Sequence, residues 1–430
     1  MNMLKLIRVS QISKSLHALK SAKITSRTFL SSAYPCNEIW ENRLNQPLFD
    51  KINLDELYHD LDLNFQKTKC MSAIDVDIFV NGLKDDIFDD EMLDLVHKLR
   101  LTEETSNSLP SLSYAVVKTL LENKKIEDLH TVLDDRLNYG IFLDTHLTNI
   151  LLDHFWLKKD FVSGARIASQ LMLQEDPEHP ISHNLSLLHC YNCLLNKGEW
   201  SFPPPPEEPE EEVKVRVKYI RNEYDDQHFD LRDCKKILGK TLMYLTKTKK
   251  DSLNISFHIL GAALFGRNDV AENKLEEALK NNSSLIKEVF DLLPEDSELR
   301  NKIENIKLSS CEINSILEKN VEEAIKIASE TDIATQCKLF SEWNQKRIDL
   351  LREKEEAFKK MERLKKVESL KEELKTKETK LWFFENEEKM ELEIEEIEEK
   401  KANESKNPSY FKEKKLDKAT EEYIPPQVRK

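Results

Sequence analysis

The chain has 430 residues, of which 39% are hydrophobic and 34% charged, and its formal net charge is −15. The length accommodates two or three domains. The acidic balance argues against a protein coated by nucleic acid, because phosphate binding depends on clustered lysine and arginine. The sequence contains no run of 18 apolar residues, which is about the length that a membrane-spanning helix needs. The last of only seven glycines is Gly266, and no proline lies between Pro294 and Pro408. This distribution predicts an all-α fold.

Residues 1–30 differ in composition from the rest. The first acidic residue is Glu38, and six basic residues precede it, namely Lys5, Arg8, Lys14, Lys20, Lys23 and Arg27. Such composition is typical of a mitochondrial transit peptide. The triplet Arg27, Thr28 and Phe29 before Leu30 predicts cleavage near Phe29 and a location in the mitochondrial matrix. Loss of these residues would change the net charge to −21. A basic helix that stays on the mature protein is the alternative.

Residues 38–200 carry apolar stripes at helical spacing with a repeat of 35 residues. Shifting the register by that amount sets Ile126 against Phe161 and Val116 against Leu151. An earlier helix pair is expected at 74–83 and 92–99, and 180–195 continues the phase. A single hairpin leaves one apolar face uncovered, so we expect the hairpins to stack into a helical-hairpin repeat solenoid.

Residues 201–230 interrupt this array with the run PPPPEEPEEE. Its prolines cannot continue a helix, and the composition is typical of a spacer, with a ligand for a proline-recognition module as the alternative. Residues 231–340 then read as a second helical-hairpin block. It comprises a hairpin of 254–265 and 270–279 around Gly266, followed by a helix at 285–293.

Residues 341–405 are expected to form one long charged helix with a thin apolar stripe, which is only marginally a coiled coil. Its charge is polarised, with 11 basic and 8 acidic residues in 351–380 but 2 basic and 9 acidic in 381–400. A solvated helix is one interpretation. The adjacent Trp382, Phe383 and Phe384 favour a partner surface instead. We expect 406–430 to be a flexible tail.

No catalytic pattern is present, because the chain has no phosphate-binding glycine loop, no glycine-flanked serine and no histidine pair at metal-ligand spacing. Cys190 and Cys193 form a lone CxxC, and the next cysteine is Cys234. A zinc site needs a second ligand pair at defined spacing, so buried cysteines are the favoured interpretation. We therefore expect neither an enzyme nor a cofactor or bound metal.

The stretch 139–153 resembles a pentatricopeptide repeat. Its Tyr-Gly-Ile-Phe-Leu-Asp turn leads into a helix that contains Thr-Asn-Ile-Leu-Leu. Leu143 stands where that family prefers proline, and Thr148 where it prefers tyrosine. In sequence-reading members the helix asparagine selects a base. Here Asn149 and Asn184 occupy that position in successive repeats, but Tyr114 occupies it one repeat earlier. Base-by-base reading is therefore not expected, and a packing role for Asn149 is favoured.

The segment LSSAYPCNEIWENR, the YGIF stretch and the charged tail together are similar to the family of the twenty-seventh small-subunit protein of the mitochondrial ribosome. The similarity is best over residues 28–195. It implies an all-helical protein that is assembled on the small-subunit ribosomal RNA among neighbouring mitoribosomal proteins and that catalyses nothing. We take tRNA and mRNA as further candidate partners.

The candidate RNA contacts are Lys124, Lys125, Asn149, Lys158 and Lys159, because the lysines fall on inter-helix turns where they could touch phosphates. Plain surface lysines are the alternative. The candidate partner contacts are Trp382, Phe383 and Phe384. Two other functions remain open: a free mitochondrial pentatricopeptide factor for RNA processing or translation, and a matrix helical-repeat adaptor that binds only proteins.

Overall fold

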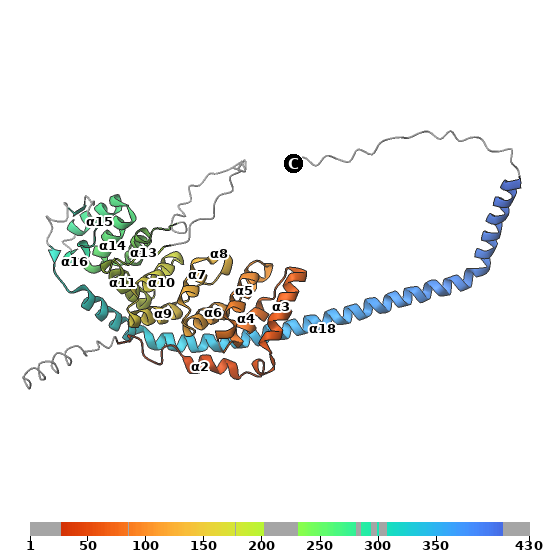
Figure 1. Cartoon of the computed structure of the whole chain (residues 1–430), viewed down its shortest axis with the longest axis horizontal. Coiled ribbons are helices and arrows are strands. Elements are labelled where there is room, and N and C mark those ends of the chain that lie inside the picture. Colours follow the sequence, from red (N-terminus) through yellow and green to blue (C-terminus); the bar gives the residue numbers. More distant parts are fainter. Residues whose placement is uncertain are drawn as a thin grey trace, which may run out of the picture. The chain divides into compact units, whose positions relative to one another are not determined.

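The computed structural model describes residues 27–84, 86–176, 178–201, 231–280, 285–293, 299–300 and 308–406. The all-α class is confirmed, since helices make up nearly all of the regular structure in these residues (Figure 1). Residues 1–26 of the predicted leader, the run PPPPEEPEEE and residues 407–430 of the predicted tail lie outside the described residues.

The first block consists of α-helices joined by short turns. They are α2 (Asn37–Glu41), α3 (Leu54–Thr68), α4 (Ala73–Gly82), α5 (Asp89–Arg100), α6 (Pro110–Glu122), α7 (Ile126–Asp134), α8 (Arg136–Tyr139), α9 (Thr145–Lys158), α10 (Phe161–Leu173) and α11 (Pro180–Leu195). Four short 3₁₀ turns lie between them, namely η1 (Asn42–Asn45), η2 (Phe49–Lys51), η3 (Asp86–Phe88) and η4 (Glu103–Asn107).

The helix starts follow the repeat found in the sequence. Helices α6, α9 and α11 begin at Pro110, Thr145 and Pro180, and α7 and α10 begin at Ile126 and Phe161, so that equivalent helices start 35 positions apart. Proline suits the first helical turn, where its missing N–H has no intrahelical partner. At Thr145 the Asp144 side chain instead accepts from the Leu147 amide at 2.7 Å.

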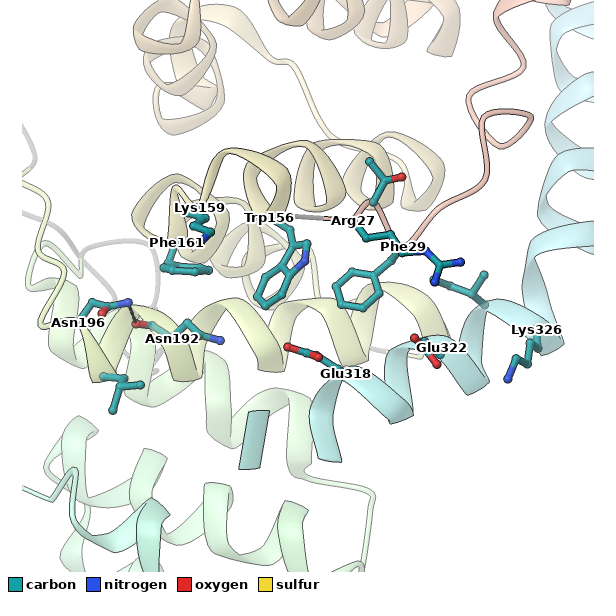
Figure 2. A pocket seen from close by; sticks show the side chains of 13 residues that line it. Arg27, Phe29, Trp156, Lys159, Phe161, Asn192, Asn196, Glu318, Glu322 and Lys326 are labelled. Atoms are coloured by element: carbon teal, nitrogen blue, oxygen red, sulfur yellow. Dashed lines mark hydrogen bonds between the residues drawn. The ribbon is translucent and has the colours of Figure 1, made fainter. Parts of the chain in front are cut away.

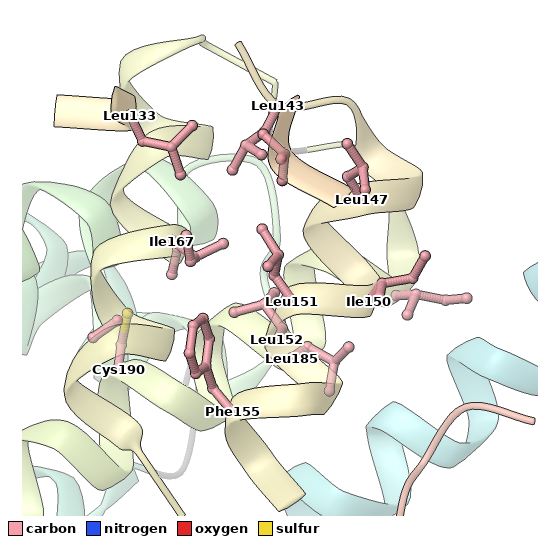
Figure 3. Close-up of a cluster of buried hydrophobic side chains, with 14 of the residues drawn as sticks. Leu133, Leu143, Leu147, Ile150, Leu151, Leu152, Phe155, Ile167, Leu185 and Cys190 are labelled. Carbon is pink, nitrogen blue, oxygen red and sulfur yellow. The ribbon is translucent and has the colours of Figure 1, made fainter. Parts of the chain in front are cut away.

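The apolar core is continuous through this block and includes the amino-terminal segment. Figure 3 shows part of it, where Leu147 and Leu151 of α9, Leu185 of α11 and Ile167 of α10 gather in one cluster. Leu147, Leu151, Ile167 and Leu185 are all fully buried. In this cluster α9, α10 and α11 bury their apolar residues against one another.

The second block contains α13 (Cys234–Thr246), α14 (Ser252–Phe265), α15 (Asn268–Lys280) and α16 (Lys287–Phe290). Helices α13 and α14 cross closely, because a Cβ on Gly239 would lie 2.7 Å from the Gly261 carbonyl oxygen. The helix expected at 285–293 is shorter than predicted. Its start is instead a two-residue parallel pairing of β1 (Leu285–Ile286) with β2 (Leu308–Ser309), where the Ile286 amide donates to Ser256 Oγ at 3.2 Å.

Helix α18 runs from Ile313 to Lys406 and thus begins well before the expected boundary at 341. The residues of α18 up to Leu350 belong to the first compact unit of the chain, and a second unit begins at Leu351. The first part of α18 contacts α11, α6 and α4 in turn, through Asn314, Phe340 and Arg347. The earlier start has a physical reason, since Val321, Ala324 and Ala328 supply a buried helical stripe before the charged region.

Candidate functional site

The turns that follow α6, α9 and α11 share one backbone geometry. In each turn a lysine one or two positions after the end of the helix has a positive φ. The values are 60° at Lys124, 59° at Lys159 and 49° at Lys197. The amide of this lysine donates to the carbonyl three residues back, and the following amide donates to the carbonyl five residues back. This is the Schellman arrangement, which satisfies the last carbonyls of a helix.

Glycine is the usual residue at such a position, because other residues lose roughly 1–2 kcal/mol in the left-handed region. The equivalent turn after α14 does use glycine, with φ of 90° at Gly266. The side chains of Lys124, Lys159 and Lys197 are exposed, and no ion pair within the described part of the chain holds them. They leave three uncompensated positive charges at equivalent turns, where phosphate oxygens could be bound.

Two other predicted lysines lie beside these turns. Lys158 is exposed at the end of α9. Lys125 is paired with buried Asp89 at 3.2 Å, and the hydrogen bond to this carboxylate raises the pKa of the lysine. Asn123 donates to both oxygens of Asp89 at 2.9 Å. Lys125 is therefore engaged within the protein, where it ties the turn to the start of α5.

Lys197 was not predicted from the sequence. It follows Lys159 by 38 positions rather than 35, because α11 has 16 residues where α9 has 14 and because Asn196 separates Lys197 from the end of α11. Only the turn geometry identifies it as the equivalent of Lys159. A search for lysine two or three positions after the last apolar residue of each first helix, without a fixed period, would have found it.

Asn149 has no exposed surface. Its amide nitrogen donates to the Tyr34 hydroxyl at 2.8 Å, and its oxygen accepts from Ser182 Oγ at 2.7 Å. Asn184, one repeat later, donates to the Pro180 carbonyl of its own helix at 2.9 Å. Both side chains make hydrogen bonds within the protein. Asn149 lies inside the protein, where a nucleotide base cannot reach it.

The chain's own segments cover the helix face on which Asn149 lies. Tyr34 of the amino-terminal segment is fully buried and donates to Asp332 of α18 at 2.9 Å. Asp332 also accepts from His179 Nε2 at 3.1 Å. Further along α18, Phe340 packs against Tyr114 with ring centroids 5.1 Å apart. A nucleic acid would therefore have to contact the turns or the outer helices rather than this face.

A cavity of about 800 Å³ opens where the amino-terminal segment enters the fold (Figure 2). One wall is aromatic: the ring centroids of Phe29 and Trp156 lie 5.2 Å apart, and those of Trp156 and Phe161 lie 5.7 Å apart. Glu318 and Glu322 of α18 line the other side. The remaining lining residues are Arg27, Thr28, Lys159, Asn192, Leu195, Asn196, Ile325 and Lys326.

The predicted partner contacts lie in the second unit. Trp382, Phe383 and Phe384 are 58%, 45% and 68% exposed, and the rings of Phe383 and Phe384 meet edge to face at 5.9 Å. Their surroundings on α18 are exposed charged side chains. The triplet thus presents apolar area that the described part of this unit does not cover.

The two cysteines of the CxxC pair are buried in α11, and burial raises the pKa of both thiols. A thiol held in its neutral form is a poor nucleophile and a poor metal ligand. In the described residues no helix is long and apolar enough to cross a membrane.

The chain matches the model of one protein family over most of its length. That model, described as mitochondrial 28S ribosomal protein S27, matches residues 3–373. The matched span includes the lysine-bearing turns and the part of α18 that covers Asn149, and it ends before Trp382. The chain therefore belongs to the family of mitochondrial 28S ribosomal protein S27, a protein of the small subunit of the mitochondrial ribosome.

Proposed function

We propose that this protein is a non-catalytic, RNA-contacting structural component of the mitochondrial small ribosomal subunit that supports mitochondrial translation in the matrix. Family membership supports the place of action. The single observation that carries the RNA contact is the recurrence of an exposed lysine in the left-handed position of three equivalent turns, Lys124, Lys159 and Lys197. In a stack of hairpins, equivalent turns follow one another along one edge.

Such an edge suits the phosphate backbone of a folded RNA. Lysine contacts to phosphate position a protein without reading sequence. The burial of Asn149 supports the same view, because the position that would select a base in a pentatricopeptide repeat is used for internal hydrogen bonds. We therefore infer degenerate pentatricopeptide-like hairpins that bind small-subunit ribosomal RNA by backbone contacts.

The rest of the molecule is better suited to protein neighbours than to RNA. The chain as a whole is acidic, with a formal net charge of −15, and Trp382, Phe383 and Phe384 offer an apolar surface for a neighbouring mitoribosomal protein. The basic leader would direct import and be removed by cleavage near Phe29. Contact with tRNA or mRNA has no specific support among the described residues.

The test is sedimentation of mitochondrial lysate on a sucrose gradient with magnesium, comparing a tagged wild-type protein with K124Q/K159Q/K197Q. The wild type should migrate in constant proportion to small-subunit RNA, and the variant should shift towards the top of the gradient when salt is raised. K67Q/K236Q/K287Q removes the same charge from exposed lysines away from these turns and should migrate like the wild type.

A wild-type protein that stays at the top of the gradient would contradict the ribosomal role. A free RNA factor would then remain in RNase-sensitive complexes, and a protein adaptor in RNase-resistant ones. If the two triple variants dissociate at the same salt concentration, the turns are not the RNA contact.

A further inference from the structure

The first side chains of the described amino-terminal segment that pack into the fold follow directly after Thr28. Arg27 and Thr28 are exposed, Phe29 is half-buried, and Leu30 is 7% exposed. Tyr34 is fully buried. Arg27 and Thr28 therefore contribute little to the packed fold, whereas Phe29 packs against the core and Leu30 and Tyr34 belong to it.

Asp153 of α9 meets the chain at this same point. Its Oδ1 accepts from the Phe29 amide at 2.7 Å, and the Leu30 amide also donates to its carboxylate. One helical turn further, the Trp156 ring lies against the Phe29 ring. Residue 29 is thus fixed at its backbone nitrogen and at its side chain by two residues of one helix.

The carboxylate is buried without a positive partner. Asp153 is 8% exposed, and burial raises its pKa, while the two backbone amides lower it. Within the described residues no cationic side chain adds to these influences. A buried carboxylate that lacks a counter-charge costs folding free energy, and a nearby ammonium group would offset that cost.

We propose that an endopeptidase of the matrix hydrolyses the Thr28–Phe29 bond and that Asp153 then holds the new Phe29 α-ammonium group as a buried ion pair. The inference rests on the import part of the proposed function. Water adds across the peptide C–N bond, so that Thr28 leaves with a carboxylate and Phe29 retains an ammonium at neutral pH. The nitrogen that donates one hydrogen bond as an amide then carries a positive charge and three donors, and its hydrogen bond to Asp153 becomes charge-assisted.

Cleavage further along the chain would break internal contacts. Removal of Tyr34, for example, would leave Asn149 and Asp332 without the hydroxyl that both now contact. Cleavage before Arg27 would leave Asp153 facing a neutral amide. Hydrolysis at Phe29 also removes Arg27 and Thr28 from the lining of the 800 Å³ cavity, so processing would open that cavity beside α18.

The first experiment is mass spectrometry of the intact protein and its amino-terminal peptide after isolation from mitochondria. The expected terminus is Phe29. A terminus at the initiator end would contradict both the leader and this inference. A terminus at another position between Ser31 and Trp40 would leave the import proposal standing and overturn the role of Asp153.

The second experiment is a thermodynamic cycle on the full chain and on the chain that begins at Phe29, each with and without D153N. The amide introduced by D153N would keep an oxygen acceptor but lose the charge. Urea unfolding at pH 7 should show that D153N raises the unfolding constant at least tenfold more in the processed chain than in the full chain. D144N changes the half-buried aspartate that caps α9 and should have equal effects in both chains.

Equal effects of D153N in the two chains would overturn the ion pair. If D153N prevents folding in both, the α-amine itself decides the question, without any variant. Acylation of the Phe29 amine, followed by mass spectrometry, should be at least tenfold slower in the folded processed chain than in urea. Equal labelling rates would contradict the proposal.

Discussion

Arg347 of α18 donates to Asp77 of α4 at 2.7 Å, with side chains that are 1% and 0% exposed. The two residues are 270 positions apart. Asp77 also accepts from Ser111 Oγ at 2.5 Å and from Asn81 Nδ2 at 3.0 Å. This buried network joins the first half of α18 to the hairpins, and it fixes the register of one against the other.

Replacing one partner of this pair should be strongly destabilising. R347M leaves the Asp77 charge buried and uncompensated, so we expect the free energy of unfolding to fall by about 3–5 kcal/mol. The double variant D77N/R347M removes both charges and should recover part of that loss. Urea unfolding followed by circular dichroism measures both. Equal losses in the single and double variants would show that the charge pair is not what matters.

The turn lysines should contribute to binding at a cost in stability. K159G relieves the strain of the left-handed backbone at this position. The greater entropy of glycine in the unfolded chain offsets part of this gain, so the free energy of unfolding should rise by about 0.5–1 kcal/mol. Binding to a small-subunit RNA fragment should weaken, and the slope of log affinity against log salt should fall by about 1 for each phosphate that the variant no longer binds.

Glu175 supplies the matched control for this prediction. It has φ of 58° in the same type of turn after α10, and it is exposed. E175G should therefore stabilise the fold as K159G does, without weakening RNA binding. If E175G weakens RNA binding as much as K159G, the change acts through the turn backbone and not through the lysine charge.

The sequence predicted the helical hairpins better than it predicted the part of α18 that packs against them. Apolar residues at helical spacing locate α6, α7, α9 and α10, because local periodicity reflects which face is buried. Arg347 lies in a run of charged residues and therefore reads as solvated. Its burial depends on Asp77, which is far away in the sequence. Local patterns do not encode such a pairing, so the expected helix boundary at 341 missed the packed first half of α18.

The same limit applies to the candidate site. The turn lysines Lys124 and Lys159 could be predicted, since the turns between apolar stripes are visible in the sequence. The engagement of Lys125 with Asp89 could not, because it depends on how α5 meets the next hairpin. Asp153 was not predicted as a partner of the amino-terminal segment, which lies more than a hundred positions away.

Gly164 of α10 should not tolerate alanine. A Cβ there would lie 2.0 Å from Nδ1 of His189, whose Nε2 is bonded to the Leu152 carbonyl at 2.8 Å. Although alanine has the higher helix propensity, by about 1 kcal/mol, the overlap should dominate, and we expect G164A to lower the free energy of unfolding by about 1–3 kcal/mol.

The background variant H189A reverses this expectation. Without the imidazole, alanine at position 164 meets no ring, so G164A should become neutral or stabilising by about 1 kcal/mol. Urea unfolding of the four proteins gives the coupling free energy. An unchanged effect of G164A in the two backgrounds would rule out the contact with His189 as its cause.

Acid should destabilise the fold in a window set by buried histidines. Burial lowers the pKa of His130, His146 and His189 to about 4 and that of His183 to about 3, and it also lowers the pKa of His154 and His258. Unfolded histidine titrates near 6.5. Below that pH the unfolded chain binds protons that the folded chain excludes. Stability is therefore complete above about pH 6.5 and is lost as the pH falls towards 4.

Asp144 acts in the opposite direction. Burial raises its pKa to about 6, so its contribution is present at low pH and is lost as the pH rises through 6. Burial also raises the pKa of Asp153 and of Glu318. These carboxyl groups do not outweigh the larger number of histidines, and the net free energy of unfolding should fall between pH 6.5 and 4.5. Urea titrations across this range measure it. H189Q should make the dependence shallower by up to about 1.4 kcal/mol per pH unit, and a flat profile for the wild type would contradict the prediction.

The aromatic triplet of α18 should affect association without weakening the helix. W382A/F383A/F384A removes exposed side chains, and alanine has the higher helix propensity, so helicity should be kept or raised. Retention on the small subunit during a high-salt wash should fall, because a buried aromatic cluster carries much of the energy of an interface.

L364A/V367A/L370A removes three exposed apolar residues from the same helix and is the matched control. Loss of retention in the first variant alone identifies the triplet as the docking surface, whereas equal loss in both assigns docking to the general apolar character of the helix.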